Sequence, residues 1–498
     1  MLFNSIDFLI FFPIVLIVYF VIPDKIKYIW LLAASYFFYM GWNAKYALLL
    51  LASTVVTYLS GLLLERTKHS TWNEKKIICC KKWIVAGSFI INLGILIFFK
   101  YSNFAIDTIN SICSSLNVRF SVPAFDIVLP VGISFYTFQA LSYTMDVYRN
   151  DIYAEKNFFR YALFVSFFPQ LVAGPIERSK NLLSQLSKPQ KFNFANARDG
   201  FLLMLWGYFL KIVLADRIAI FVDTVYGDYA NYPGWYLIVA SALFAIQIYC
   251  DFAGYSTIAL GAAQILGIKL TENFNAPYLS VSVGQFWRKW HISLTSWFKD
   301  YLYIPLGGSR CSALRKYINK MIVFLVSGLW HGASFTYVIW GGLNGLYLVI
   351  GEALAPAKAK IYKFLHLNRD SYAHKLVQVI VTFILIAFAF IFFRASTVSE
   401  SFQVIKSIFT ADNRWVLFDG SLYQCGLDIS NFILMIVSIA LLLFVDICKH
   451  KGIVIRNIIV KQDYWFRYLF IALAILALLV FGKYGPAYDS ANFIYFQF

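Results

Sequence analysis

The amino-acid sequence predicts an all-α protein, a polytopic integral membrane bundle of helices. Of its 498 residues, 60% are hydrophobic, 19% aromatic and only 14% charged, a composition that belongs in lipid. About a dozen stretches run roughly 15 to 22 residues between formally charged side chains, close to the ~20 residues that a helix needs to cross ~30 Å of hydrocarbon. These runs lack the period-2 alternation of an outer-membrane barrel, so helices must satisfy the backbone hydrogen bonds.

The longest uncharged runs mark the expected membrane helices. The N-terminus opens with Asp7 before its first apolar run and lacks the basic region and cleavage site of a signal peptide, so we expect residues 6–23 to remain as the first membrane helix. The last is expected at about residues 468–482. One membrane domain, residues 1–498, is expected to account for the whole chain. The clearest runs between these ends cover residues 46–64, 127–145, 229–250 and 376–393.

Positive charge sets the expected orientation. The loop 65–82 carries six Lys and Arg residues, and cytoplasmic loops are enriched in these types, so we expect it in the cytoplasm and the N-terminus outside. Residues 83–99 then lead out to a nearly neutral segment, 100–126, and the run 127–145 leads back in.

Later loops follow the same rule. The basic loops 358–375 and 449–461 are expected inside, and the mixed segment 394–428 outside. The net charge of +17 lies in such loops, where it meets anionic lipid, so no nucleic-acid partner is expected. The seven cysteines form no C-x-x-C pair, and we expect neither a disulfide framework nor a metal site.

The apolar run 161–176 contains Pro169, Gly174 and Pro175 and precedes a basic loop, 178–198, that is also expected in the cytoplasm. Non-helical backbone at membrane depth is tolerated only where protein or a water-filled cavity surrounds it. We therefore expect a re-entrant, cavity-lining segment, with an ordinary short span as the alternative.

Residues 286–301 form an amphipathic pattern. We expect one helix along the membrane interface, with its aromatic face in lipid, its cations toward headgroups or anionic ligands, and His291 at the edge of the apolar face. At about 100° per residue, one arc of roughly 120° collects the apolar side chains Phe286, Trp287, Trp290, Leu294, Trp297, Phe298 and Tyr301.

Of the six histidines, His331 stands out because residues 321–351 contain no Asp, Glu, Lys or Arg. Eleven helical residues from Lys320 rise about 16 Å, which places His331 near mid-membrane. An ionisable group at that depth is costly, so a catalytic role is expected, with a helix–helix hydrogen bond as the alternative. A neutral imidazole suits general-base catalysis.

The other histidines outside the amphipathic stretch lie in or beside basic loops and are expected to be solvated: His69, His366, His374 and His450.

Small residues surround His331. Gly332 and its neighbours leave room for a substrate or another helix, and Gly341 and Gly345 form a G-x-x-x-G pattern that predicts a helix contact.

Asp251, between uncharged runs, is a candidate to bind substrate or a cation, or else to form a structural ion pair. The motifs G-x-S-x-G, H-E-x-x-H, the P-loop and G-x-G-x-x-G are absent from the sequence, which disfavours hydrolases, metalloproteases and nucleotide motors.

At these residues the sequence resembles the membrane-bound O-acyltransferase family. Residues 286–310, FWRKWHISLTSWFKDYLYIPLGGSR, look like its signature. Residues 327–334, SGLWHGAS, resemble the segment that bears the family's catalytic histidine, here His331, and WRKWH resembles the one that bears its second, here His291. Further similar stretches are LPVGISFYTF (129–138), DVYR (146–149), FPQLVAGPI (168–176), YCDFAGYS (249–256) and FIYFQF (493–498).

Within the family, the stretches look more like the alginate O-acetylation branch and related cell-wall acetyltransferases than like the teichoic-acid D-alanylation branch. Thr257 departs from this pattern, since an Asp is expected there in the alginate proteins. The acceptor and any second acid beside Asp251 therefore stay open.

The resemblance implies tilted helices around a central funnel in a bacterial cell membrane, an acyl thioester donor such as acetyl-CoA from the cytoplasm, and no tightly bound cofactor. It also implies an exported glycan acceptor that is acylated through an extracytoplasmic SGNH-like partner protein. His331 would remove the acceptor proton, and His291 would orient the acyl group or hydrogen-bond the reaction centre. We expect the donor phosphates near Arg288, Lys289 and Arg310, although these cations also suit headgroup anchoring.

Other functions remain open from the sequence. A proton-coupled transporter or flippase of a glycan export system would use Asp251 and His331 as a relay. A teichoic-acid D-alanylation type of acyl transfer and a non-enzymatic scaffold are further alternatives.

Overall fold

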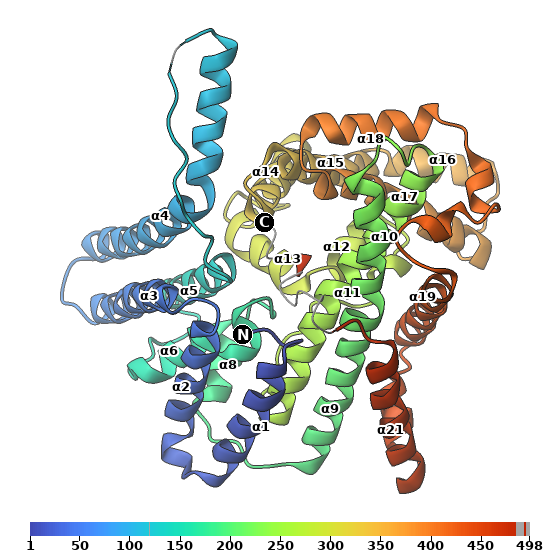
Figure 1. Ribbon diagram of the computed structural model, residues 1–498. Coiled ribbons are helices and arrows are strands. Elements are labelled where there is room, and N and C mark those ends of the chain that lie inside the picture. The colour runs from blue at the N-terminus through green and yellow to red at the C-terminus, as the bar shows by residue number, and fades with distance from the viewer. Residues whose placement is uncertain (119, 485–492, 495–498) are drawn as a thin grey trace. The chain divides into compact units, whose positions relative to one another are not determined.

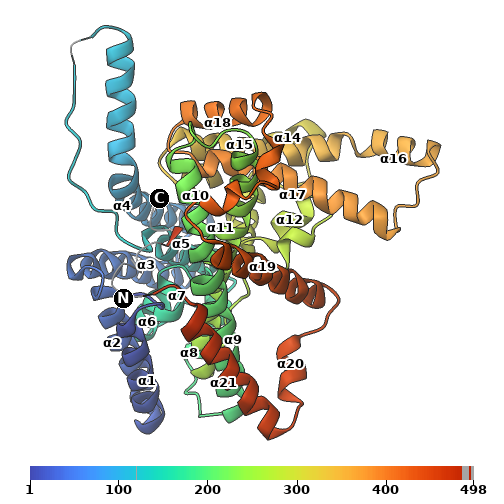
Figure 2. The same cartoon turned by 45° about the vertical axis from the view of Figure 1, so that its right-hand side comes forward.

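The computed structural model describes residues 1–118, 120–484 and 493–494 (Figure 1 and Figure 2). Regular secondary structure in these residues is helical, which confirms the predicted all-α fold. Among the described residues, six helices are long and apolar enough to cross a membrane, or up to seven if a pair bent by 51° is one span. The polytopic membrane bundle is therefore confirmed.

The candidate spans coincide with most of the predicted ones. The runs 46–64, 83–99, 376–393 and 468–482 lie within or closely overlap helices of this set, and 229–250 overlaps another from residue 235. The spans are Ala44–Lys68, which includes α3 (Ala47–Lys68), and α4 (Glu74–Ser115), α11 (Trp235–Ile265), α17 (Tyr372–Arg394), α19 (Ile429–His450) and α21 (Tyr464–Phe481), with α15 (Phe335–Ala353) and α16 (Ala355–Phe364) as the bent pair.

The chain divides into two compact units. Unit 1 comprises Met1–Met204 and Ala259–Thr271, and unit 2 comprises Leu205–Ile258 and Glu272–Phe498, so α9 (Phe194–Tyr208) and α11 have residues in both. The single domain expected from the sequence stays a prediction. Besides α3 and α4, unit 1 contains α1 (Ile6–Val21), α2 (Lys27–Met40), α5 (Ile133–Tyr148), α6 (Phe158–Ser166), α7 (Phe168–Leu171) and α8 (Ser179–Leu186).

One segment of unit 1 differs from the prediction, and another extends a predicted helix. The helix expected from residue 127 begins only at Ile133, because the preceding residue, Gly132, adopts a left-handed backbone with φ +74°. This position favours glycine, since a Cβ there would collide with the carbonyl of Leu171. The neutral segment 100–126 is helical to Ser115, since α4 continues for 42 residues and turns sharply along its length (Figure 1).

The interrupted segment at 161–176 is confirmed. Helix α6 ends at Ser166 after nine residues, Phe167 has φ −52° and ψ 110°, and α7 covers only four residues. Both helices are too short to cross ~30 Å of hydrocarbon. Residues 161–177 are buried, as irregular backbone at membrane depth requires. The re-entrant path through the bilayer stays a prediction.

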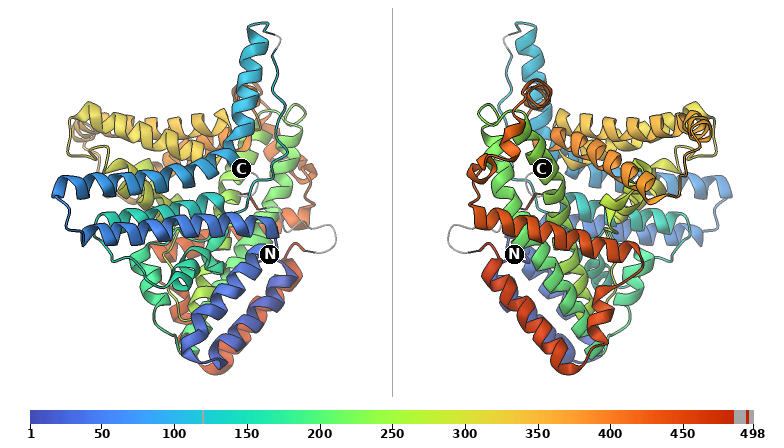
Figure 3. Two further views of the ribbon diagram at one scale, coloured as in Figure 1. Left: turned by 90° about the vertical axis from the view of Figure 1, so that its left-hand side faces the viewer. Right: turned by 90° about the vertical axis from the view of Figure 1, so that its right-hand side faces the viewer.

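Unit 2 carries His331 on a helical hairpin and His291 between two short helices. Helices α14 (Ala313–His331) and α15 run antiparallel and side by side (Figure 3). The G-x-x-x-G prediction is confirmed, because a Cβ at Gly341 would meet the carbonyl of Phe324 and one at Gly345 would lie 2.9 Å from the Met321 sulfur. Besides the spans, unit 2 contains π-helical segments at Phe209–Ala215 and Lys299–Tyr303, and α10 (Asp216–Gly227), α12 (Val283–Lys289), α13 (Ile292–Phe298), α14 (Ala313–His331), α18 (Val398–Thr410) and α20 (Ile455–Val460).

Candidate active site

His331 is the last residue of α14, at the tip of the α14–α15 hairpin. Gly332 is extended, with φ −158° and ψ 151°, and Ser334 caps α15 by accepting a hydrogen bond from the Thr336 N–H. The helix from Lys320 to His331 is unbroken, as the depth argument assumed. The chain then turns back, so that the imidazole lies at a helix end rather than in the middle of a continuous span.

Aromatic rings surround the His331 imidazole. Its ring centroid lies 5.0 Å from Trp330, 5.0 Å from Trp340 and 5.6 Å from Phe393, each in an edge-on arrangement. The side chain is only 4% exposed. Edge-on aromatic contacts favour one ring orientation, so these neighbours hold the imidazole in place.

His291 lies next to His331, with 6.4 Å between the ring centroids. It is fully buried, packs edge-on against Phe252 at 4.7 Å, and adopts φ +43°. A non-glycine residue in the left-handed region is strained, and such strain often marks a functional site.

The expectation of one continuous helix over residues 286–301 is wrong. Helix α12 ends before Trp290 and α13 starts after His291, because another loop takes the backbone hydrogen bonds at the break. The Ile292 N–H donates to the Asn273 carbonyl at 2.9 Å, and the Lys289 carbonyl accepts from Asn275 at 3.0 Å. The break turns His291 inward, toward His331.

The aromatic face of this region does not lie in lipid, which corrects a second expectation. Trp287 and Trp290 are buried, and Trp287 packs against Trp340 at 5.7 Å while its indole N–H donates to Asn344 at 3.2 Å. Trp290 packs on Phe390 at 5.7 Å. These aromatic side chains fill the space beside α15 and α17, and Trp340, on which Trp287 packs, contacts the His331 ring at 5.0 Å.

Asp251 on α11 is held by a buried cation. The Lys211 ammonium lies 2.6 Å from Asp251 and 2.9 Å from Asp216, and the backbone N–H of Ile494 donates to the second Asp251 oxygen at 2.8 Å. Lys211 belongs to the π-helical segment 209–215, a rare element that often occurs at functional sites. Asp251 therefore takes part in an ion-pair cluster; its predicted role in substrate binding stays a prediction.

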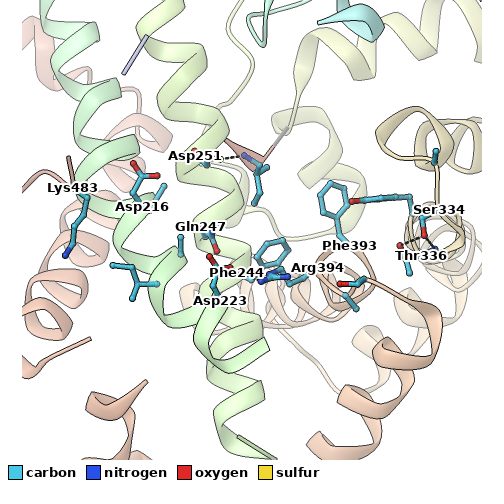
Figure 4. Close-up of a pocket in the computed structure, with 18 of the residues that line it drawn as sticks. Asp216, Asp223, Phe244, Gln247, Asp251, Ser334, Thr336, Phe393, Arg394 and Lys483 are labelled. Atoms are coloured by element: carbon cyan, nitrogen blue, oxygen red, sulfur yellow. Dashed lines mark hydrogen bonds and ion pairs between the residues drawn. The ribbon is translucent and has the colours of Figure 1, made fainter. Parts of the chain in front are cut away.

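A cavity of about 790 Å³ opens beside these residues within unit 2 (Figure 4). Its wall includes Ala333 and Ser334, which follow His331 directly, and Asp251. The ring of Phe393 lines the cavity and also contacts His331, and Tyr337 packs on Phe393 at 4.9 Å. One layer of side chains thus separates the imidazole from the cavity. The rest of the wall mixes apolar side chains with polar and charged ones, the latter being Asp216, Asp223, Gln247, Thr336, Arg394, Ser396 and Lys483.

Comparison with known proteins identifies the family. The sequence profile of the membrane-bound O-acyltransferase family, MBOAT, matches residues 154–396. The probable alginate O-acetylase of Pseudomonas aeruginosa is 35% identical over 82% of this chain and 75% of its own length. The corresponding protein of Pseudomonas putida is 32% identical over the whole of both chains. The peptidoglycan O-acetyltransferase of Helicobacter pylori is 34% identical over 82% of this chain and 80% of its own.

This chain belongs to the membrane-bound O-acyltransferase family. It is therefore an enzyme, an O-acyltransferase, and a multi-pass membrane protein. The matched region includes His291 and His331. The resemblance stated from the sequence is confirmed; the roles of the individual residues stay predictions. Of the terminal stretch FIYFQF, residues 495–498 lie outside the described residues.

The basic residues expected at the donor site of this O-acyltransferase are not gathered in one contact. Arg288 and Arg310 are exposed, and the Lys289 ammonium lies 3.3 Å from the His450 Nδ1. Burial lowers the pKa of Lys289, and the Asp446 carboxylate acts in the opposite direction. Within the described residues, no hydrogen bond or ion pair joins Arg310 to the other two.

Sequence reasoning missed Lys211, although the signal was present. It is an isolated cation in the apolar run between Asp199 and Asp216, the same kind of signal that singled out Asp251. At Thr257, where the alginate branch is expected to carry Asp, the hydroxyl donates to the Ala253 carbonyl at 2.6 Å, one helical turn earlier. The Thr257 side chain is therefore bonded to its own helix and supplies no carboxylate beside Asp251.

Proposed function

We propose that this O-acyltransferase moves an acetyl group from a cytoplasmic thioester, acetyl-CoA, to hydroxyl groups of an exported polysaccharide or cell-wall glycan in a bacterial cytoplasmic membrane. The names of its relatives, which describe O-acetylation of alginate and peptidoglycan, support the acetyl group and the glycan. The observation that carries the proposal is the buried pair of His331 and His291 beside a polar cavity large enough for a sugar-sized acceptor.

His331 acts as the general base. It takes the proton of an acceptor hydroxyl, the oxygen attacks the thioester carbonyl, and the carbon–sulfur bond breaks to release the thiol with a proton returned from the imidazolium. A positioned base contributes roughly 10² to 10⁴ in rate, so orientation of the two substrates supplies much of the remainder. His291, whose ring centroid lies 6.4 Å from that of His331, orients the acyl group or donates a hydrogen bond to the reaction centre.

The substrates approach from opposite sides. The donor phosphates meet Arg288, Lys289 and Arg310 at the cytoplasmic mouth. The acceptor hydroxyl enters through the 790 Å³ cavity, where Phe393 and Tyr337 turn aside to admit it. An extracytoplasmic SGNH-like partner protein completes the transfer to the glycan.

Replacing His331 tests this proposal. We expect His331→Ala to lower acetyl transfer from labelled acetyl-CoA in inverted membrane vesicles by roughly 10²- to 10⁴-fold, at normal membrane abundance, with a matching loss of acetyl esters on the exported glycan. His69→Ala, which changes an exposed histidine, is the matched control and should retain activity. Unchanged acetylation in His331→Ala, or transport that follows the pH gradient without covalent label, would contradict the proposal.

A further inference from the structure

A second cavity, of about 210 Å³, lies within unit 1. It is formed by the end of α1, the start of α2, helix α6 and the turn that follows α8. Its wall carries four cations and a single carboxylate, an excess of three positive charges. These residues are Asp24, Lys25, Lys27, Arg160 and Lys188, together with Tyr19, Tyr28 and mostly apolar or uncharged neighbours.

The one carboxylate is already engaged. The buried Lys27 ammonium lies 2.7 Å from Asp24 and donates to the Gln190 carbonyl at 2.9 Å, with the Tyr19 ring on another side at 5.4 Å. Lys27 is only 6% exposed, so this contact fixes it as part of the wall. The charge of Asp24 is therefore neutralised by Lys27 and does not offset the other cations.

Three cations of the wall lack a counterion. Lys25, Arg160 and Lys188 form no ion pair with any residue that the structure describes. The Arg160 guanidinium stacks on Tyr28 at 5.3 Å, and its Nε is buried without a hydrogen-bond partner among these residues. A buried N–H of a charged group is costly to leave unsatisfied. Because Arg160 lines the cavity, an anionic group bound there could accept this hydrogen bond.

We propose that this cavity binds a phosphate group, that of an anionic phospholipid headgroup. Arginine and lysine together provide the fork-shaped donor and point charges that phosphate oxygens accept. The volume is below the roughly 300–1,000 Å³ of pockets for drug-sized ligands, which favours a headgroup over a whole coenzyme. Basic pockets between membrane helices on the cytoplasmic side are suited to such headgroups.

Two features favour a lipid over free phosphate. The orientation expected from the basic loop 65–82 puts the turn after α1 and the loop 178–198 on the cytoplasmic side, where anionic lipids concentrate. The outward side chains at the end of α1 are apolar, with Ile17 67% and Val21 78% exposed. Acyl chains would lie along this face of α1 while the phosphate reaches the cations just beyond Val21.

The test measures binding of short-chain phosphatidylglycerol and phosphatidylcholine to the purified full-length protein, stripped of lipid, by native mass spectrometry. We expect phosphatidylglycerol to bind at least about tenfold more tightly, and the triple variant K25Q/R160Q/K188Q to weaken it about a hundredfold, near fivefold for each charge removed. Lys191→Gln, an exposed lysine of the same loop outside the cavity, is the matched control and should change binding by less than about twofold.

Equal binding of the two lipids, or unchanged phosphatidylglycerol binding in the triple variant, would overturn the proposal. If Arg160→Gln fails to fold, the exposed pair K25Q/K188Q should still weaken binding, and Arg160→Lys should retain most of it. Competition with inorganic phosphate distinguishes the two possible ligands, a phospholipid headgroup and a soluble phosphate. Resistance of the lipid to displacement supports a headgroup, whereas displacement supports the same cation site with a soluble phosphate as its ligand.

Discussion

Lys211 is a buried cation held between two carboxylates of unit 2. Its side chain is 1% exposed, and those of Asp251 and Asp216 are 4% and 9% exposed. Charges removed from water are tolerated when they are paired, and loss of one partner of a buried pair costs about 3–5 kcal/mol because the other is left uncompensated. The same cluster fixes the described C-terminal residues through the bond from Ile494 to Asp251.

Replacing Lys211 by Met should therefore lower the thermal stability of the protein strongly, and the double variant K211M/D251N should recover part of the loss. Melting curves of the detergent-purified proteins give the coupling between the two positions in a double-mutant cycle. Asp251→Asn separates the two roles considered for this residue. A normal melting temperature with lost acetyl transfer would favour a substrate role over the structural one argued from the geometry.

Single residues were predictable from the sequence where an ionisable group interrupts an apolar run. His331 and Asp251 meet that criterion, whereas His291 was singled out in an amphipathic, basic stretch. The structure brings the two histidines together. Residues such as Gln247 and Phe393 line the cavity because helices distant in the sequence pack there. No local sequence pattern predicts that packing. The position of His291 depends on a backbone break that Asn273 and Asn275 complete from another loop.

The α14–α15 hairpin depends on glycines at the contact between its helices. A Cβ at Gly341 would collide with the Phe324 carbonyl, which is backbone and cannot rotate away, whereas a Cβ at Gly342 would lie 3.6 Å from a Leu325 methyl group. The two neighbouring positions therefore differ in steric room and share the same helical environment. Since His331 lies at the tip of this hairpin, separation of the helices would move the imidazole.

Gly341→Ala should therefore lower both the melting temperature and acetyl transfer, while Gly342→Ala should be neutral or stabilise the helix by up to about 1 kcal/mol. Overpacking of a tight contact typically costs about 1–3 kcal/mol. The measurement is a melting curve with an acetyl-transfer assay on the same preparations. Equal behaviour of the two variants would show that the hairpin does not rely on this close approach.

Hydropathy runs located most spanning helices, because a run without charges has few other stable structures in lipid. The same reasoning failed over residues 286–301, where an arc of aromatic residues predicted one interfacial helix. An aromatic face packs equally well against lipid or against other aromatic side chains, and Trp287 and Trp290 do the latter. The periodicity was sound within α12 and α13, and tertiary hydrogen bonds broke the helix between them.

At the scale of the whole molecule, composition was sufficient to predict a membrane bundle, and charge distribution predicts its orientation. Composition does not reveal the two units, because residues 259–271 belong to the first although their neighbours on both sides in the sequence belong to the second. The orientation decides whether the 790 Å³ cavity opens toward an exported acceptor. It follows from the basic loops alone, which makes a direct test worthwhile.

Helix α17 provides the test, since its 23 residues would rise about 34 Å and so cross the hydrocarbon once. Asp370 is exposed just before it, in the loop expected inside, and Ser396 is exposed just after it, at the cavity. The background protein retains the buried Cys250 and Cys425 and has its other five native cysteines replaced by serine. A single cysteine introduced at residue 370 or 396 then reports on which side of the membrane that residue lies. We expect a membrane-impermeant maleimide to label Ser396→Cys in intact spheroplasts and Asp370→Cys only in inverted vesicles. Because both probes flank one helix, labelling of both from the same side would mean that α17 does not cross the membrane. Labelling of Asp370→Cys in spheroplasts and of Ser396→Cys only in inverted vesicles would put the cavity on the cytoplasmic side, away from any exported glycan.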